Sequence, residues 1–109
     1  LFEQSGVIRA DTIHEMFDIA ACLEAQPLPP GRRVAILTNA GGPGILAADA
    51  CVAAGLQVVE FGDSTRDALR AFLPPEASVT NPVDMVASAG ADEYRQALRT
   101  MLAAPDVDA

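Results

Sequence analysis

The sequence predicts an α/β fold: a partial flavodoxin-like (Rossmann-like) domain with three layers around a parallel sheet, truncated at both ends. The first observation is "VAIL" at 34–37, a continuous apolar run typical of a parallel strand covered on both faces. The second is a glycine-rich turn at 41–44 that joins this strand to an alanine-rich helical segment over 43–54. The third is the repetition of strand and helix along the chain, which implies right-handed crossovers in one sheet.

The segments after this first strand and helix keep the alternation. Gly55 is a natural C-terminal cap for the helix, and "LQVVEF" at 56–61 predicts the second strand. A helix is expected over 63–73, with acidic residues near its start, and the following Pro74 and Pro75 end it.

The last part of the chain predicts a loop, a helix and the start of a strand. Residues 76–90 are expected to be mostly loop, and 91–105 to form a helix. The final "DVDA" at 106–109 leads into a third strand that the chain truncates, which would leave an exposed sheet edge. The expected apolar face of the helix consists of Ala91, Tyr94, Leu98, Met101 and Leu102.

The N-terminal segment predicts a helix with a capped start. Residues 1–10 are expected to hold a helix end, a turn at Gly6 and an extended piece. The next helix covers 11–26, where Thr12 and Glu15 have the spacing of a capping box. Its expected apolar stripe is Ile13, Met16, Phe17, Ala20 and Leu23.

A proline-rich linker predicts a module boundary after this helix. Three prolines within 27–30 stop both helix and strand and form a semi-rigid connection. We therefore expect residues 1–28 to be the tail of a preceding module with its linker, and residues 29–109 to be an incomplete second module.

Composition and charge exclude several classes of partner. The formal net charge is −8 over 109 residues, and an acidic surface repels nucleic acids and anionic membranes. No apolar run reaches the length of a membrane span. Cys22 and Cys51 lack the spacing of metal ligands and are interpreted as buried thiols in a reducing compartment. We expect a cytoplasmic protein with no metal site and no nucleic-acid or membrane partner.

The glycine turn predicts an anion site at the start of the first α/β helix. Without Cβ atoms, the turn lets backbone amides meet a ligand closely, and Pro43 suits the first helical position. The free amides and positive end of the helix favour a phosphoryl group or a carboxylate. The alternative is a tight turn that serves packing alone, because the segment matches neither GxxxxGK[ST] nor GxGxxG. The candidate residues are Thr38, Asn39, Gly41, Gly42 and Gly44.

The loop "TNPVDM" at 80–85 is the other candidate. Asn81 and Asp84 are expected at the same sheet edge as the glycine turn, where Asp84 would orient a substrate group or a histidine. The alternative is a polar loop whose side chains bond their own backbone. His14 is the only histidine and is interpreted as a solvated helix residue, so no catalytic residue is predicted within the chain.

Three segments together resemble the NDP-forming acyl-CoA synthetases, the superfamily of ADP-forming acetate–CoA ligase and succinyl-CoA synthetase. The same modules also occur fused to GNAT-type protein lysine acetyltransferases. The match covers nearly the whole chain, with "TNAGGPG" followed by "NPVDM" as its specific pair. The segments are "GRRVAILTNAGGPGILAADACVAAGL", "LRAFLPPEASVTNPVDM" and "YRQALRTMLAAPDVDA".

The resemblance implies an activity that this chain shares with other modules. The family interconverts acyl-CoA, ADP and phosphate with a carboxylic acid, CoA and ATP, through an acyl phosphate and a phosphohistidine. That histidine would precede Leu1, and His14 does not match it. The glycine-turn helix would face the phosphohistidine loop, and Asn81 and Asp84 would line the same site.

The resemblance also implies the partners and cofactors. A CoA-binding/phosphohistidine module and an ATP-grasp module would lie in the same chain or another subunit. CoA, ATP/ADP and Mg²⁺ belong to the full-length enzyme, and the fragment alone would bind none of them. The chain starts without Met, and we expect a segment of a longer polypeptide that lacks activity alone.

Two other functions stay open at this point. The chain could be a ligand-sensing or degenerate synthetase region of a GNAT-fused acetyltransferase, which replacement of the upstream histidine would favour. It could instead be a non-catalytic interaction module, which an absence of any anion effect on stability would favour. The truncated third strand also predicts a homodimer, because an unpaired edge invites pairing with a second copy.

Overall fold

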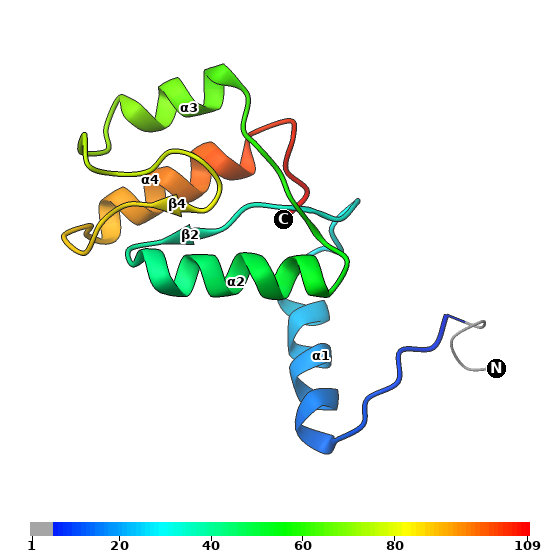
Figure 1. Cartoon of the computed structure of the whole chain (residues 1–109). Coiled ribbons are helices and arrows are strands. Elements are labelled where there is room, and N and C mark those ends of the chain that lie inside the picture. The colour runs from blue at the N-terminus through cyan, green and yellow to red at the C-terminus, as the bar shows by residue number, and fades with distance from the viewer. Residues whose placement is uncertain (1–5) are drawn as a thin grey trace.

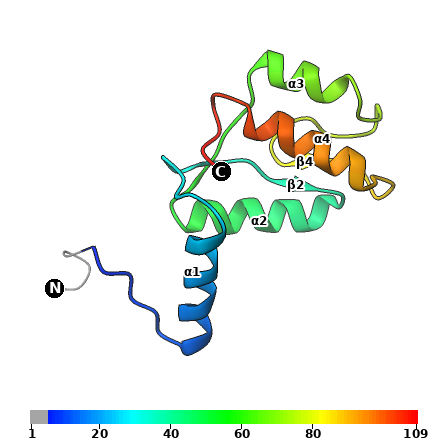
Figure 2. The ribbon, with the colours of Figure 1, turned by 180° about the vertical axis from the view of Figure 1, so that it is seen from behind.

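The computed structural model describes residues 6–109, which form a three-layer α/β domain with a helix projecting from it. In Figure 1, α2 (Gly41–Ala53) covers one face of the strands, while α3 (Asp63–Arg70) and α4 (Ala91–Leu102) lie over the other face. The reverse view in Figure 2 shows the same order of layers. The predicted three-layer α/β fold is confirmed.

The sheet is built around one extended segment whose two halves pair with different strands. β1 (Arg33–Val34) pairs in parallel with β3 (Gln57–Val58), and β2 (Leu37–Thr38) pairs in parallel with β4 (Val83–Asp84). The predicted strands at 34–37 and 56–61 are therefore present, though each is shorter or divided.

β3 and β4 follow one another along a single edge of this central segment. The amide of Gln57 donates to the carbonyl of Arg32, and the amides of Val83 and Met85 donate to those of Ile36 and Thr38. All three carbonyls belong to even-numbered residues, and alternate peptide groups of an extended strand face the same edge. The carboxyl ends of β2 and β4 therefore meet beside the start of α2.

The C-terminal residues occupy the opposite edge of the central segment. The amide of Asp108 donates to the carbonyl of Arg33 at 2.7 Å, and the amide of Ala35 donates to the carbonyl of Ala109 at 2.8 Å. The predicted third strand at 106–109 therefore lies beside the first.

The prediction of mostly loop over 76–90 missed β4. Ser78 also forms an antiparallel bridge with Asp84, with backbone bonds of 2.9 and 3.1 Å. A strand of two residues, preceded by the cis Asn81–Pro82 peptide, is too short to give an alternating apolar pattern. This missed strand is the element that brings "NPVD" to the glycine turn.

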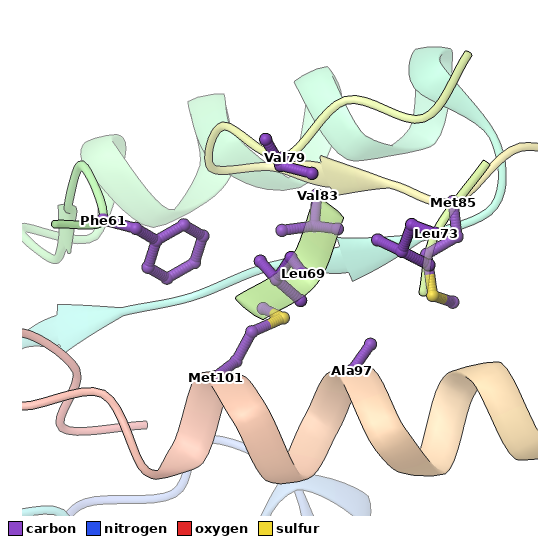
Figure 3. Close-up of a cluster of buried hydrophobic side chains, with 8 residues drawn as sticks. All are labelled: Phe61, Leu69, Leu73, Val79, Val83, Met85, Ala97 and Met101. Atoms are coloured by element: carbon purple, nitrogen blue, oxygen red, sulfur yellow. The ribbon is translucent and has the colours of Figure 1, made fainter. Parts of the chain in front are cut away.

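The hydrophobic core lies between the sheet and the α3/α4 layer. Leu69 of α3, Val83 of β4 and Met85 are fully buried, and Figure 3 shows them facing Ala97 and Met101 of α4. On the α2 side, Gly44 is the one buried residue of the helix. Most of the buried apolar side chains of the domain therefore lie between the sheet and the α3/α4 layer.

The buried face of α4 differs from the predicted one. Ala97 and Met101 are buried, but Leu98 and Leu102 are 45% and 66% exposed. Tyr94, Ala97 and Met101 recur at intervals of three and four residues, which is about one helical turn each. The small Ala97 therefore takes the central core position that the predicted face gives to a leucine. The helix also ends at Leu102, three residues before the predicted end.

α2 begins two residues before the predicted start. Gly41 is its first residue, so Pro43 occupies the third helical position and not the first. Proline is tolerated there because amides in the first turn have no intrahelical acceptor. Gly55 has a φ of +78°, and its amide donates to the carbonyl of Val52 at 3.0 Å, which confirms the predicted C-terminal glycine.

α1 (Ile13–Ala25) stands away from the domain in both Figure 1 and Figure 2. Thr12 Oγ1 accepts the amide of Glu15, as predicted, while Glu15 Oε2 accepts the amide of Asp11. No residue of α1 is buried, and the apolar stripe is exposed. The predicted helix end before Gly6 lies outside the described residues. None of the helices within 6–109 has the length and hydropathy needed to cross a bilayer.

Candidate functional site

A pocket of about 260 Å³ joins the glycine turn to the "NPVD" segment. It forms because β2 and β4 pair side by side, so that the residues at their carboxyl ends meet the start of α2. Two sequence candidates far apart in the chain thus share one cavity. Its lining consists of Thr38, Gly41, Ile45, Ser78, Thr80, Pro82 and Asp84.

The start of α2 leaves backbone N–H donors free, and anion binding there stays a prediction. Ala40 is the N-cap and supplies no side-chain hydrogen bond, and the first turn carries no acidic residue. Within residues 6–109, the amides of Gly41 and Gly42 have no acceptor. The free donors and the positive end of the helix dipole therefore stay available to an anion.

The three glycines of the turn have different surroundings. A Cβ on Gly42 would meet nothing within 4 Å, so this position is open. A Cβ on Gly41 would lie 3.1 Å from Asp84 Oδ2, which places that carboxylate beside the first turn. A Cβ on Gly44 would lie 2.9 Å from Thr38 Cγ2, so Gly44 serves close packing of α2 on β2. Phosphate binding at Gly44 stays a prediction.

Thr38 and Asn39 occupy the turn between β2 and α2. The Thr38 hydroxyl accepts the amide of Ala40 at 3.1 Å and donates to the carbonyl of Ala40 at 3.0 Å. Thr38 therefore shapes the turn as well as lining the pocket. Asn39 is exposed and does not line the pocket, so its predicted ligand role rests on the sequence alone.

Asp84 is held on three sides. Its backbone exchanges hydrogen bonds with Ser78, and it pairs with Thr38 of β2 in the parallel ladder. Its Oδ1 accepts the amide N–H of Val86 at 3.0 Å. Val86 has a φ of +62°, a conformation that costs free energy for a β-branched residue and needs surrounding structure to maintain it. Oδ2 remains on the side of Gly41 and can accept a hydrogen bond from a ligand donor.

Asn81 has a structural role that the sequence interpretation did not foresee. Its Oδ1 accepts the amide of Ile36 at 2.9 Å, and its Nδ2 donates to the carbonyls of Val34 and Val59 at 2.8 and 2.9 Å. The Asn81 side chain thus bonds the central segment at the point where its pairing with β3 ends and its pairing with β4 begins. The predicted alternative, in which Asn81 and Asp84 bond the backbone of their own loop, is wrong for Asn81, whose partners are distant in sequence, and is confirmed for Asp84 by its bond to the amide of Val86. No bonding capacity beyond one Oδ1 lone pair remains for substrate.

Arg33 and Asp108 fasten the C-terminal segment to β1. Arg33 Nη2 and Nε donate to the two carboxylate oxygens at 2.7 and 3.0 Å, and the amide of Arg33 donates to Asp108 Oδ2 at 2.9 Å. The hydrogen bond from the Arg33 side chain, with that from its amide, lowers the pKa of Asp108 from its usual range. This pair supports the sheet and does not line the pocket.

His14 lies on α1, with its side chain 91% exposed and its Nε2 3.7 Å from Asp18 Oδ2. It contributes nothing to the pocket at the start of α2, in agreement with its interpretation as a solvated residue. The described part of the chain therefore brings no histidine, and no nucleophile with a base, to this site.

Sequence reasoning missed four lining residues: Ile45, Ser78, Thr80 and Pro82. Ser78 Oγ and Thr80 Oγ1 lie 2.9 Å apart and add hydroxyl groups to the pocket wall. The signal was present as two hydroxyl residues at alternate positions just before Asn81. The alternation predicts nothing in a segment that is expected to be loop.

Comparison with known proteins assigns the family. The Ligase-CoA domain family matches residues 34–109, which run from the second residue of β1 to the C-terminal segment and include both halves of the pocket. The chain belongs to the Ligase-CoA domain family. The recognised resemblance is thereby confirmed.

Curated relatives of this Ligase-CoA domain are considerably longer. This chain is 50% identical over 107 residues to the Acetate--CoA ligase [ADP-forming] II subunit alpha of Pyrococcus furiosus, and the match covers 98% of this chain and 23% of the relative. It is 39% identical over 107 residues to the 4-hydroxybutyrate--CoA ligase [ADP-forming] of Nitrosopumilus maritimus, covering 98% of this chain and 15% of that protein. The domain thus spans about a quarter of its relatives' length or less.

Solved structures share the same arrangement. PH0766 from Pyrococcus horikoshii OT3 matches 98% of this chain and 24% of its own, with 50% identity and a TM-score of 0.88. The Ca. Korarchaeum cryptofilum dinucleotide forming Acetyl-coenzyme A synthetase 1, solved in complex with phosphate and ADP, matches 98% and 23% of the two chains, with 34% identity and a TM-score of 0.87.

Proposed function

We propose that this Ligase-CoA domain is one module of an ADP-forming acyl-CoA synthetase. In this proposal the start of α2 binds the phosphoryl group that is transferred between an acyl phosphate and a histidine. The observation that carries the proposal is the uncapped start of α2, with the amides of Gly41 and Gly42 free beside the pocket. The family membership and the 50% identity to an ADP-forming acetate–CoA ligase subunit support the reaction class.

The residues of this chain would stabilise charge, and a second module would supply the reacting histidine. Amides of the first turn of α2 would donate to phosphoryl oxygens as negative charge shifts between acyl phosphate and phosphohistidine. Asp84 Oδ2 would accept the N–H of the imidazole nitrogen that carries no phosphoryl group. Asn81 would hold the wall of the pocket in place through its sheet bonds.

The cofactors would be bound mainly by other modules. CoA supplies the thiol and ADP accepts the phosphoryl group, but the start of α2 lacks the lysine and hydroxyl pattern of a nucleotide phosphate loop. Within residues 6–109, no three His, Cys, Asp or Glu side chains gather closely enough to hold a metal ion.

The partners would be a CoA-binding/phosphohistidine module and an ATP-grasp module, together with a small carboxylic acid and phosphate. Residues 1–28 would be the tail of the preceding module, which agrees with an α1 that buries nothing against the domain. Cys22 is exposed and Cys51 is partly buried, so the prediction that both thiols are buried is wrong for Cys22. Both thiols are free, which supports a reducing compartment, and we place the protein in the cytoplasm.

A thermal-shift titration with phosphate and acetyl phosphate tests the site. Binding at ten times the Kd should stabilise the parent by about 1.4 kcal/mol. Gly42→Asp should abolish the shift by placing a carboxylate over the amides, while Gly42→Ala should keep it, because a Cβ there meets nothing within 4 Å. Equal shifts in Gly42→Asp and the parent would place the anion elsewhere.

A further inference from the structure

A second cavity adjoins the pocket at the start of α2. It has a volume of about 140 Å³ and is lined by Glu60, Phe61, Arg66, Thr80 and Asn81. Thr80 also lines the pocket at the start of α2, so the two cavities meet at this residue. The second cavity lies between the segment that leaves β3, the start of α3 and the segment that precedes β4. A phosphoryl group at the start of α2 leaves this cavity free.

Arg66 and Glu60 bring opposite charges to the second cavity without pairing with one another. Arg66 Nη2 donates to Asp63 Oδ1 on the same helix, and the Arg66 side chain is 31% exposed. Within residues 6–109, Nε and Nη1 of Arg66 donate to no acceptor, and the Glu60 carboxylate accepts no hydrogen bond. The cavity therefore offers free donors from a guanidinium group and free acceptors from a carboxylate.

The other polar side chains of the second cavity already have partners. Both ends of the Asn81 amide are bonded to the sheet, and the Thr80 hydroxyl lies 2.9 Å from a neighbouring serine hydroxyl. Phe61 is 3% exposed and adds an apolar border. Recognition of a polar group in this cavity would therefore depend on Arg66 and Glu60.

We propose that the second cavity holds the far end of the acyl group and selects a small carboxylic acid with a terminal hydroxyl group; this rests on the proposed function. An acyl phosphate whose phosphoryl group lies at the start of α2 would extend its chain past Thr80 into this cavity. The cavity has the volume of about five water molecules, which suits the end of a short chain.

Charge favours a hydroxyl group over a second carboxylate or a methyl group. Asp63 already balances the charge of Arg66, so Glu60 leaves the surroundings of the cavity negative and opposes a carboxylate. A hydroxyl group can accept a hydrogen bond from Arg66 and donate one to Glu60, which satisfies both charged groups at once. A methyl group would satisfy neither of them.

The selectivity of the assembled synthetase among three four-carbon acids tests the proposal. Butyrate, 4-hydroxybutyrate and succinate end in a methyl, a hydroxymethyl and a carboxylate group, and kcat/KM is measured for the formation of each CoA ester. The parent should prefer 4-hydroxybutyrate to the other two by about tenfold or more. Arg66→Leu should lower this preference to about twofold or less. Glu60→Gln removes a negative charge and should raise kcat/KM for succinate relative to butyrate by about threefold or more.

Arg70→Leu is the matched control for Arg66→Leu. Arg70 pairs with Asp67 at the same helical spacing as Arg66 with Asp63, but it does not line the second cavity. Its preference among the three acids should stay within about twofold of the parent. Phosphorylation of the histidine by ATP needs no acyl group, so Arg66→Leu should leave it within about twofold of the parent as well.

A parent that favours butyrate or succinate would overturn the proposal, as would equal selectivity in Arg66→Leu and the parent. Loss of histidine phosphorylation in Arg66→Leu would also overturn it, because Arg66 would then act on the phosphoryl site or on folding. A preference for the hydroxy acid that depends on Arg66, in an enzyme that forms no phosphohistidine, would support the second cavity and contradict the proposed function.

Discussion

Asn81 is the residue on which the relative placement of the pocket walls depends. One side chain replaces the backbone bonds that are lost where β3 leaves the central segment and β4 joins it. Asparagine is suited to this position because its amide offers a donor and an acceptor, as a peptide group does. The sequence indicated a special role for "NPVD" but not this one, since the bonded strands are distant in sequence.

Replacement of Asn81 should therefore destabilise the domain. Asn81→Asp removes both donors and leaves the carbonyls of Val34 and Val59 facing a carboxylate. We expect a loss of about 3 kcal/mol in the free energy of unfolding by urea. Asn39→Asp is the matched control at an exposed asparagine and should change stability by less than about 0.5 kcal/mol. Similar values for the two variants would contradict the structural role.

Gly44 and Gly42 give a second residue-scale comparison. A methyl group at Gly44 meets Thr38 Cγ2 at 2.9 Å, whereas a methyl group at Gly42 meets open space. Gly44→Ala should cost about 1–3 kcal/mol through overpacking, and Gly42→Ala should be neutral or stabilising. Thermal unfolding of the two variants measures the difference, and a more stable Gly44→Ala would refute the packing argument.

The elements could largely be predicted from the sequence, and their boundaries less well. α1, α2, α3 and α4 follow from caps, glycines and apolar spacing, which are local signals. β4 could not be predicted because two residues give no periodicity. The apolar spacing assigns the buried face of α4 to leucines, whereas its buried residues are Ala97 and Met101, which Figure 3 shows facing the sheet side of the core.

The pairing of the C-terminal segment with β1 should depend on pH through Asp108. Its pKa is lowered by Arg33, so the folded state holds the carboxylate more strongly than the unfolded state does. The stabilisation is present above the unfolded pKa of about 3.9 and is lost as pH falls through the lower folded pKa. Asp108→Asn should therefore be less stable than the parent at pH 7, with the difference shrinking below about pH 4. A difference independent of pH in urea titrations would contradict this linkage.

At the scale of the whole molecule, the proposed function makes the chain one part of a reaction site. The pocket has donors at α2 and an acceptor at Asp84, but the described residues bring no histidine to it. The glycines of the turn predict the anion site, and the family resemblance implies that its occupant would come from another module. We expect the isolated chain to form no ATP from acetyl-CoA, ADP and phosphate in a coupled assay. Turnover by the isolated chain would refute the modular account.

The most direct test of the central claim is phosphorylation of histidine in the assembled synthetase, measured with radiolabelled phosphate and acetyl-CoA. Gly42→Asp should reduce formation of phosphohistidine and ATP by about 100-fold or more, because it removes charge stabilisation at the start of α2. Gly42→Ala should stay within about threefold of the parent, since its methyl group meets no atom within 4 Å. Normal phosphohistidine formation in Gly42→Asp would contradict the assignment of the phosphoryl site to α2.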